Sequence, residues 1–286
     1  MKQGIIVFAH NNRKIDYARM AIVAGSLAKK NLGKPVSLIT DQSTVDWLEQ
    51  SGAYDRAKKL FDQIILTERP QDEQQRVLRD GINKDSVPFN NSNRPSIWEL
   101  TPYDRTLLID SDYFTLTDNL NEYWDVDDDL LICHDYNDIF GKERTGYHDV
   151  YLSDTGIKLL WATTVMFTKN SHTKVFFELV NYVRKNYKLF SDIYRFDNRL
   201  YRNDISFSIA YHILNGFEQA QNYKLPPVFS ITDKDMLYSV DEYGFTVLAA
   251  INGNENYIPA RIRNKDVHIM NKQSILRNID KLLETS

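Results

Sequence analysis

Short apolar runs alternate with amphipathic stretches through the first hundred residues, and this alternation most limits the folds open to the chain. Apolar runs at residues 4–9, 36–40 and 63–67 predict buried strands. Between the first two, residues 16–30 carry apolar side chains at three- and four-residue spacing, which predicts an amphipathic helix with Asp16 as its N-cap. Strands that alternate with helices typically form a parallel sheet with helices on its faces. We therefore expect an α/β fold with a mostly parallel central sheet.

The rest of the chain predicts further strands and helices around one acidic motif. Residues 68–94 are polar and contain proline and asparagine, which predicts a long loop beside a site. Residues 95–101 predict one or two helical turns, and residues 105–109 predict a strand that ends directly at Asp110. The remaining expected strands are 130–133, 163–168, 245–251 and 266–270, and the remaining expected helices are 44–50, 173–187, 204–214 and 272–283. We expect one domain that spans residues 1–286.

The composition narrows the classes of function. The chain has 286 residues, of which 42% are hydrophobic, and this content excludes a disordered tail. The net charge of −4 gives no overall basic surface for a nucleic acid or a membrane. A single cysteine, Cys133, excludes a disulfide framework and a cysteine-based zinc site. No apolar run approaches the ~20 residues that span a bilayer, so we expect a soluble, cytoplasmic protein with no membrane partner.

Two aspartates separated by one residue can chelate a divalent cation, and the chain contains four such pairs. Only Asp110 and Asp112 directly follow a strand-like apolar run, residues 106–109. Ligands of α/β sheets bind beyond the carboxyl ends of the strands. This position therefore predicts a cation site at Asp110 and Asp112, whereas the other three pairs are typical of solvated turns.

Residues 94–120 resemble a segment of the nucleotide-sugar glycosyltransferases of the GT-A fold, and most closely glycosyltransferase family 8, the glycogenin-like enzymes. The shared order is a basic residue, a short helix with a tryptophan, a tyrosine, an apolar strand, the Asp-x-Asp pair and an Asn-Leu segment, here Arg94, Trp98, Tyr103, residues 106–109, Asp110, Asp112, Asn119 and Leu120. Asn203-Asp204 is similar to the family's Asp-Gln motif on the acceptor side. Val267-His268-Ile269-Met270 is similar to its Val-His-Phe metal-ligand strand. The resemblance implies a GT-A (Rossmann-like) three-layer sandwich, with a nucleotide-sugar-binding half at about 1–135 and an acceptor-binding half at about 136–286.

The same resemblance implies roles for particular residues. Asp110, Asp112 and His268 would hold Mn²⁺ or Mg²⁺, and an imidazole among carboxylates suits Mn²⁺ better. The implied contacts to a UDP-sugar come from Ala9, His10, Asn11, Tyr17, Ser111 and Arg263. Arg94 would contact the diphosphate or sugar, and Asp135 and Asp204 would bind the sugar and the acceptor. The alternatives are a packed Tyr17, solvated arginines, a His268 that is only a polar strand-edge residue, and aspartates that cap helices or turns.

The function implied is transfer of a hexosyl or pentosyl group from a nucleoside diphosphate sugar, with a UDP-sugar as the expected donor, to a hydroxyl. Two segments depart from the family: Ala162-Thr163-Thr164 stands where it has Asn-Ser-Gly, and Asn271-Lys272 stands where it has a glycine and Lys-Pro. These departures leave the donor sugar and the stereochemical course open. Under inversion a carboxylate must act as base, and Asp204 is then the candidate.

The acceptor has more than one interpretation. Residues 184–202 interleave basic and aromatic side chains, a pattern typical of nucleic-acid binding, of carbohydrate stacking, or simply of a solvated helix face with buried rings. Residues 15–17 and 35–41 are similar to uncharacterised glycosyltransferases of large tailed phages. That similarity implies a hydroxymethylated base in phage DNA as acceptor, in the host cytoplasm, with a glycan or a protein as the alternative.

Two other classes of function stay open at this point. Phosphatases of the haloacid-dehalogenase type also place Asp-x-Asp after an apolar strand, although they favour Thr or Val where this chain has Phe114. A catalytically inactive protein that only binds a sugar nucleotide would share the fold.

Overall fold

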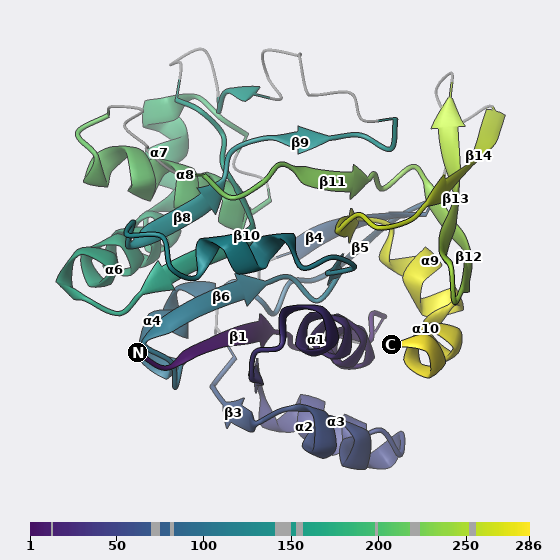
Figure 1. The fold of residues 1–286 in the computed structure, drawn as a ribbon. Helices are drawn as coiled ribbons and strands as arrows, with labels where there is room; N and C mark the ends of the chain where they lie inside the picture. Colours follow the sequence, from purple (N-terminus) through teal and green to yellow (C-terminus); the bar gives the residue numbers. More distant parts are fainter. Residues whose placement is uncertain are drawn as a thin grey trace.

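A six-stranded, mostly parallel sheet forms the centre of the protein (Figure 1). The computed structural model describes residues 1–12, 14–69, 75–80, 83–140, 150–152, 157–197, 200–217, 224–251 and 256–286. In spatial order the strands are β3 (Gln63–Leu66), β2 (Val36–Thr40), β1 (Gln3–Phe8), β6 (Arg105–Ile109), β10 (Trp161–Thr168) and β8 (Leu130–Cys133). Only β10 runs against the other five. The predicted α/β class and the mostly parallel sheet are confirmed.

Helices cover both faces of this sheet because its strands are apolar on both sides. Ile5 and Val7 of β1 pack into the same core cluster as α1 (Tyr17–Leu32), while Ile6 and Phe8 join the cluster on the opposite face. The opposite face is covered by α4 (Ile97–Leu100), α6 (Ser171–Lys185) and α8 (Asn203–Leu214). The result is a three-layer arrangement, as expected for strands that read as unbroken apolar runs. At the start of α1, the Asp16 side chain accepts a hydrogen bond from the Arg19 amide, so the predicted N-cap is confirmed.

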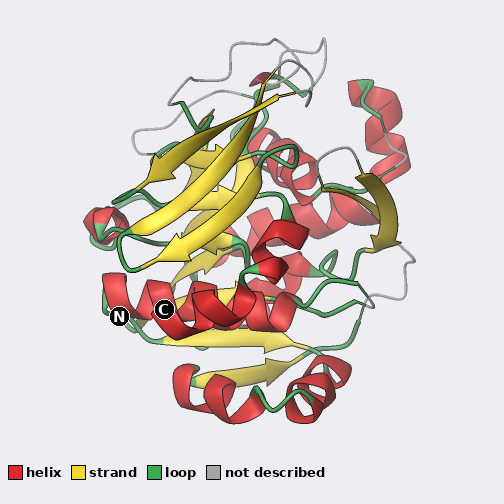
Figure 2. Cartoon of the chain, turned by 90° about the vertical axis from the view of Figure 1, so that its right-hand side faces the viewer, coloured by secondary structure: helices red, strands yellow, loops and turns green. Residues whose placement is uncertain are grey.

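Two smaller sheets and the last helices extend the side of α1 (Figure 2). One sheet has the order β7 (Tyr113–Phe114), β15 (Val267–Ile269), β11 (Val228–Ile231) and β9 (Tyr136–Asn137). The other is antiparallel and contains β12 (Met236–Asp241), β13 (Gly244–Ile251) and β14 (Asn256–Ile262). The helices α9 (Lys272–Arg277) and α10 (Ile279–Thr285) follow β15, and α10 packs against α1. The later strands thus build a second layer of sheet around the end of β6.

Aromatic side chains dominate the packing of the helices on the far face. Phe207 of α8 is fully buried and meets the rings of Phe176 and Phe177 of α6 edge to face. Four aromatic residues of the basic and aromatic segment lie in a separate buried cluster. Three of them, Tyr187, Phe190 and Tyr194, belong to helix α7 (Tyr187–Tyr194), and the fourth is Tyr201. The packed interpretation of these rings is therefore the one that the structure favours.

Several elements differ from the sequence-based expectation. The predicted loop at residues 68–94 contains a hairpin of β4 (Gln75–Asp80) and β5 (Asn83–Pro88), followed by the short 3₁₀ turn η1 (Arg94–Ser96). The hairpin escapes prediction because only Leu78 and Val87 are buried in it. The expected helix at 272–283 is divided into α9 and α10 at Asn278. The remaining elements are α2 (Gln42–Gln50), α3 (Tyr54–Leu60) and the 3₁₀ helix η2 (Asn119–Tyr123).

None of the helices in the described ranges combines the length and the apolar character that a bilayer crossing needs. Cys133 is a buried thiol at the end of β8, and its Sγ donates to the Asp135 carbonyl at 3.0 Å.

Candidate active site

A pocket of about 240 Å³ opens at the carboxyl end of the parallel strands. Asp110 follows β6 there, and its amide donates a hydrogen bond of 3.0 Å to the Thr163 carbonyl at the start of the reversed strand β10. The chain segments that wall the pocket come from the ends of β1 and β6, the start of β10, the hairpin, the start of α8 and the β15–α9 turn. Its lining includes Tyr17, Arg76, Arg94, Asp110, Ser111, Asp112, Trp161, Tyr201, Asp204, His268 and Lys272.

Asp110, Asp112 and His268 form one cluster on the pocket wall. One ligand atom of each lies within 4.8 Å of those of the others. The strand β15 brings His268 opposite Tyr113 of β7, and the Ile269 amide donates to the Asp112 carbonyl at 2.9 Å. Asp266 fixes the start of β15 by accepting from the Leu116 and Thr117 amides at 2.7 and 2.8 Å. The three residues proposed from the sequence as metal ligands are therefore brought together.

Two cationic side chains already contact the cluster. Arg94 Nη1 donates to Asp110 Oδ1 at 2.6 Å, and Lys272 Nζ donates to Asp112 Oδ2 at 2.5 Å. The same Asp112 oxygen lies 3.4 Å from His268 Nε2. Arg94 and Lys272 are 5% and 2% exposed, so both cations are buried beside the acids. Within the described part of the chain, the Arg94 nitrogens Nε and Nη2 are buried and have no hydrogen-bond partner.

The charges around the two carboxylates move their pKa values apart. Burial would raise the pKa of Asp112, but Lys272, His268 and Arg76 outweigh burial and hold it well below its ordinary value. Burial raises the pKa of Asp110, against the opposing effect of Arg94 and with the added effect of the Asp112 charge. Burial and the nearby Arg76 lower the pKa of Lys272, whereas Asp112 opposes both. Asp112 is thus the permanently ionised member of the pair.

Arg76 of β4 reaches the pocket from the hairpin and lies beside Tyr17. Burial raises the pKa of Tyr17 to about 12, and Arg76 acts in the opposite direction. Burial would lower the pKa of Arg76, but Tyr17, Asp112 and Asp110 hold it above its ordinary value. Tyr17 therefore keeps its hydroxyl proton, and Arg76 adds a third cation near the acidic cluster.

Asp204 enters the pocket from the first turn of α8. Its carboxylate accepts a hydrogen bond from the Ala162 amide at 3.3 Å and from Arg202 at 2.9 Å. Burial would raise its pKa, but Arg202, Arg76 and Arg94 together hold it below the ordinary value. The expected apolar helix after Asn203 is confirmed, and Asp204 is an ionised carboxylate in the lining of the pocket.

The cluster has the chemistry of a divalent cation site. Ligand atoms bound to one such cation at about 2.0–2.6 Å lie within about 5 Å of each other, which the 4.8 Å limit meets. Two carboxylates and an imidazole are acceptable ligands for Mn²⁺. One feature departs from the usual pattern, because His268 Nδ1 has no hydrogen-bond partner among the described residues. The residues therefore fit a metal ion.

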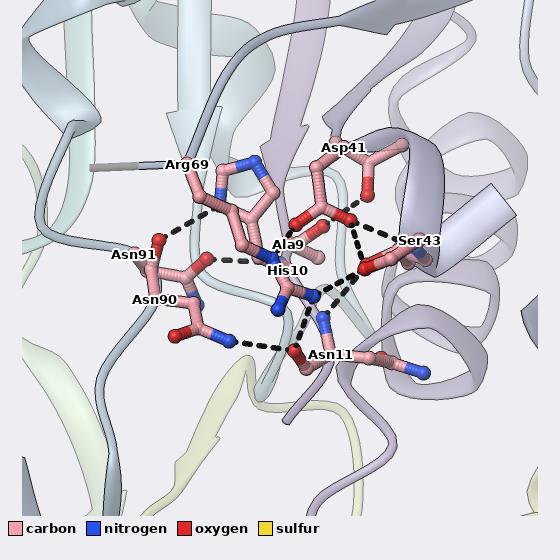
Figure 3. A network of polar contacts seen from close by, with 10 residues as sticks. Ala9, His10, Asn11, Asp41, Ser43, Arg69, Asn90 and Asn91 are labelled. Atoms are coloured by element: carbon pink, nitrogen blue, oxygen red, sulfur yellow. Dashed lines mark hydrogen bonds and ion pairs between the residues drawn. The ribbon is translucent and has the colours of Figure 1, made fainter. Parts of the chain in front are cut away.

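The predicted nucleotide-binding residues after β1 divide into two groups. Tyr17 and Ser111 line the pocket. Ala9, His10 and Asn11 lie outside its lining, in a buried network of polar contacts that Figure 3 shows. There, Arg69 contacts Asp41 and Ser43 and donates to the Asn11 carbonyl at 3.1 Å. His10 Nδ1 lies 2.9 Å from the Asn90 carbonyl, and burial lowers the pKa of His10. The structure uses these three residues to tie the loop after β1 to the ends of β2 and β5.

Asp135 and Arg263 also lie outside the lining of this pocket. Asp135 follows β8 and pairs with Lys158 at 3.0 Å. Arg263 follows β14 and stacks over the Tyr243 ring at 6.0 Å. Neither side chain therefore joins the cluster of Asp110, Asp112 and His268.

His134, next to Asp135, gives a prediction for stability. Burial, assisted by Lys224 and Lys158, lowers the pKa of His134 to about 4 from its ordinary 6.5. Between these pH values the unfolded chain binds a proton that the folded protein does not, so stability falls as the pH decreases from 6.5 towards 4. When the pH is lowered from 7 to 5, we expect the unfolding free energy of the wild type to fall by about 2 kcal/mol more than that of His134→Gln. Urea unfolding at both pH values measures this.

The exposed His172 on α6 provides the matched control for His134. His172→Gln should keep the pH dependence of the wild type. An equal loss of stability on acidification for wild type and His134→Gln would contradict the prediction.

Lys272 and Arg76 are two residues of the site that the sequence did not predict. Lys272 stands in the sequence only as a departure from the family pattern, although it is the first residue of the helix that follows the His268 strand. Arg76 had no such signal, because it lies in a polar stretch interpreted as a loop. The basic residues of 184–202 divide as well: Arg202 lines the pocket, Lys185, Lys188 and Arg195 are exposed, and Arg199 lies outside the described residues.

Comparison with known proteins gives distant structural similarity only. No known protein family matches the chain, and no curated protein does. Among solved structures it is similar to the glycosyltransferase GlyE of Streptococcus pneumoniae TIGR4, with 15% identity and a TM-score of 0.38 over 75% of this chain and 43% of that one. The chain thus spans less than half of the GlyE structure.

Two further similarities have the same character. The galactosyltransferase LgtC, solved in complex with donor and acceptor sugar analogs, is 14% identical, with a TM-score of 0.43 over 73% of this chain and 70% of that one. Mouse xyloside xylosyltransferase 1 is 10% identical, with a TM-score of 0.43 over 75% of this chain and 83% of that one. At these identities and TM-scores, the similarity assigns neither a family nor an activity to this chain.

Proposed function

We propose that the protein is a metal-dependent glycosyltransferase of the GT-A type, which moves a sugar from a UDP-sugar to an acceptor hydroxyl. The observation that carries this proposal is the cluster of Asp110, Asp112 and His268 at the end of β6, within 4.8 Å and beside a buried arginine. Segments 94–120 and 267–270, whose resemblance to family 8 glycosyltransferases predicted this cluster, supply all of its members. The nucleotide-binding half at about 1–135 and the acceptor-binding half at about 136–286 are part of the proposal.

In this mechanism the residues of the pocket bind and orient the donor. Mn²⁺ held by Asp110, Asp112 and His268 would supply Lewis-acid stabilisation of the diphosphate leaving group. Arg94 directs its two unpartnered nitrogens to phosphate or sugar oxygens, since charge-assisted hydrogen bonds to phosphate are strong. Tyr17, with a pKa of about 12, donates its hydroxyl proton in a hydrogen bond. Together these groups stabilise the negative charge that develops as the glycosidic bond to phosphate breaks.

Asp204 orients the acceptor in the same proposal. Its ionised carboxylate accepts a hydrogen bond from the attacking hydroxyl. Under inversion Asp204 is also the base, although its lowered pKa makes it a weak one. Under retention the departing phosphate takes the proton, and Asp204 only positions the acceptor.

A carbohydrate hydroxyl is the proposed acceptor. The pocket places Trp161 in its lining, and aromatic rings of this kind pack against sugar faces. A hydroxymethylated DNA base is the second candidate, on account of the exposed Lys185, Lys188 and Arg195. The buried rings of the α7 cluster offer no stacking surface for DNA, which is why the carbohydrate stands first.

The test is donor turnover in the presence of Mn²⁺. With a panel of UDP-, GDP- and ADP-sugars, we expect slow release of the nucleoside diphosphate from a UDP-sugar without acceptor, and loss of this release with EDTA. Addition of oligosaccharides, or of oligonucleotides with and without hydroxymethylated bases, should then identify the acceptor by mass increase and faster release. Binding to DNA that does not weaken with salt would remove the DNA candidate.

Other outcomes separate the competing functions. Saturable UDP binding without any turnover would indicate an inactive sugar-nucleotide-binding protein. Release of inorganic phosphate from a phosphomonoester would favour the phosphatase. Absence of both binding and turnover across the panel would contradict the proposed function.

A further inference from the structure

Lys272 contacts the oxygen of Asp112 that lies nearest to His268, and Asp112 and His268 are both proposed metal ligands. Its ammonium lies 2.5 Å from Asp112 Oδ2, and that same oxygen faces His268 Nε2 at 3.4 Å. Lys272 is 2% exposed, and the ion pair joins residues 160 positions apart in the sequence. A buried ammonium at this place serves as the counter-cation of the acidic cluster.

The backbone holds Lys272 firmly in this position. Asn271, which is fully buried, caps α9 by accepting from the Ser274 amide at 3.0 Å. Its side-chain amide donates to the Asp235 carbonyl at 2.8 Å, so the turn is tied to the start of the three-stranded sheet. The ammonium is thus delivered to Asp112 by a fixed turn, at the end of a four-carbon stem that has several rotatable bonds.

The charges near the cluster show what metal binding requires. Asp110 is paired with Arg94 and Asp112 with Lys272, so each proposed carboxylate ligand already has a cationic partner. Although burial would lower the pKa of Arg76, Tyr17 together with Asp112 and Asp110 holds that pKa above its ordinary value. A divalent cation that enters without another anion therefore adds positive charge to a site that is already balanced. Breaking the Asp112 pair also leaves a buried ammonium without a partner, which is unfavourable.

A diphosphate changes this balance. It adds negative charge and accepts hydrogen bonds from an ammonium released inside the pocket, and Lys272 lines that same pocket. Metal and nucleotide would then each improve the binding of the other, and such coupling is reciprocal.

Resting on the proposed function, we propose that Lys272 is an exchangeable counter-cation. It neutralises Asp112 in the metal-free protein, leaves Asp112 when a divalent cation binds, and is then stabilised by the diphosphate of the donor. Because of this exchange, the protein has a low affinity for the metal alone and a high affinity for the metal together with its nucleotide. The site therefore binds the divalent cation and the nucleoside diphosphate preferentially together.

The first test measures the affinity for Mn²⁺ alone by electron paramagnetic resonance or calorimetry. Lys272→Met removes the competing ammonium, and we expect this variant to bind Mn²⁺ at least about tenfold more tightly than the wild type. Lys272→Arg keeps a cation and should keep the weak affinity. Lys234→Met, a change at an exposed lysine, is the matched control and should behave like the wild type.

The second test repeats the titrations with saturating UDP. The wild type should gain more Mn²⁺ affinity from UDP than Lys272→Met does, because only the wild type has an ammonium to transfer from Asp112 to the diphosphate. The difference between the two gains measures the contribution of Lys272. If Lys272→Met does not fold, as judged by its melting temperature, Lys272→Gln gives the same comparison.

The outcomes distinguish this inference from the proposed function. Equal Mn²⁺ affinities for wild type and Lys272→Met, both measurable, would overturn the exchange and leave the metal-dependent enzyme intact. No Mn²⁺ binding by either protein, with or without UDP, would overturn both. Tight binding of UDP to the wild type that Mn²⁺ does not improve would overturn the exchange, because Lys272 would then replace the metal.

Discussion

Asp112→Asn is expected to lower kcat/KM for sugar transfer by at least about 100-fold and to abolish Mn²⁺-dependent binding of UDP. Asp112 is the carboxylate that its surroundings keep ionised, and one of its oxygens faces both His268 and Lys272. An asparagine has the same shape but no negative charge, so it loses the chelating ligand. Calorimetric titration of UDP with and without Mn²⁺, combined with donor turnover, measures the effect.

The same substitution removes the partner of a buried ammonium, so part of its effect falls on stability. Lys272 is 2% exposed, and we expect Asp112→Asn to lose about 3 kcal/mol of unfolding free energy. The double variant Asp112→Asn/Lys272→Met should recover most of this stability without recovering metal binding. This pair of results separates loss of the ligand from loss of the fold.

Asp127→Asn is the matched control, because Asp127 belongs to another Asp-x-Asp pair and is exposed. It should leave UDP binding, turnover and stability at wild-type values. If Asp112→Asn bound UDP with Mn²⁺ as tightly as the wild type, the cation site at the end of β6 would be wrong.

Phe207→Ala is expected to lower the unfolding free energy by about 3–5 kcal/mol. The Phe207 side chain is fully buried, and its ring centroid lies 5.6 Å from that of Phe176 and 6.0 Å from that of Phe177. Its removal leaves a cavity between α6 and α8 that the surrounding rings fill only in part. Urea unfolding followed by circular dichroism measures the change.

Two variants calibrate this result. Phe207→Leu keeps most of the apolar volume and should lose less stability than Phe207→Ala. Val175→Ala alters a neighbouring position on α6 whose side chain is 45% exposed, and it should change stability by less than about 0.5 kcal/mol. A loss below about 1 kcal/mol for Phe207→Ala would show that the contact between α6 and α8 is not the packing centre of that face.

The sequence predicted those parts of the fold whose signal is local. The strands β1, β2 and β6 are buried along most of their length, and each appears in the sequence as a short run in which apolar residues predominate. The hairpin of β4 and β5 has no such pattern, because its strands pair with each other at the surface and its sequence is mostly charged or polar. Local hydrophobicity therefore predicted the strands of the core sheet and could not predict the hairpin.

The candidate site shows the same division. Asp110 and Asp112 could be selected because they end a predicted strand, and His268 was added by the family resemblance rather than by its spacing. The contact of Lys272 with Asp112 depends on how β15 pairs with β7 and on where α9 begins. A lysine at the start of a helix is ordinarily exposed, so nothing local marks this one as buried.

The strand β15 lies between β7 and β11, so neither of these strands can complete its pairing before β15 is in place. During synthesis the central sheet strands emerge long before residue 267, while the nascent chain still lacks the imidazole ligand and the lysine. Because chains lengthen at about 5–20 residues per second, the acids remain without either partner for seconds on the ribosome. Asp110 and Asp112 therefore gain their contacts with His268 and Lys272 only after residue 272 has been added to the chain.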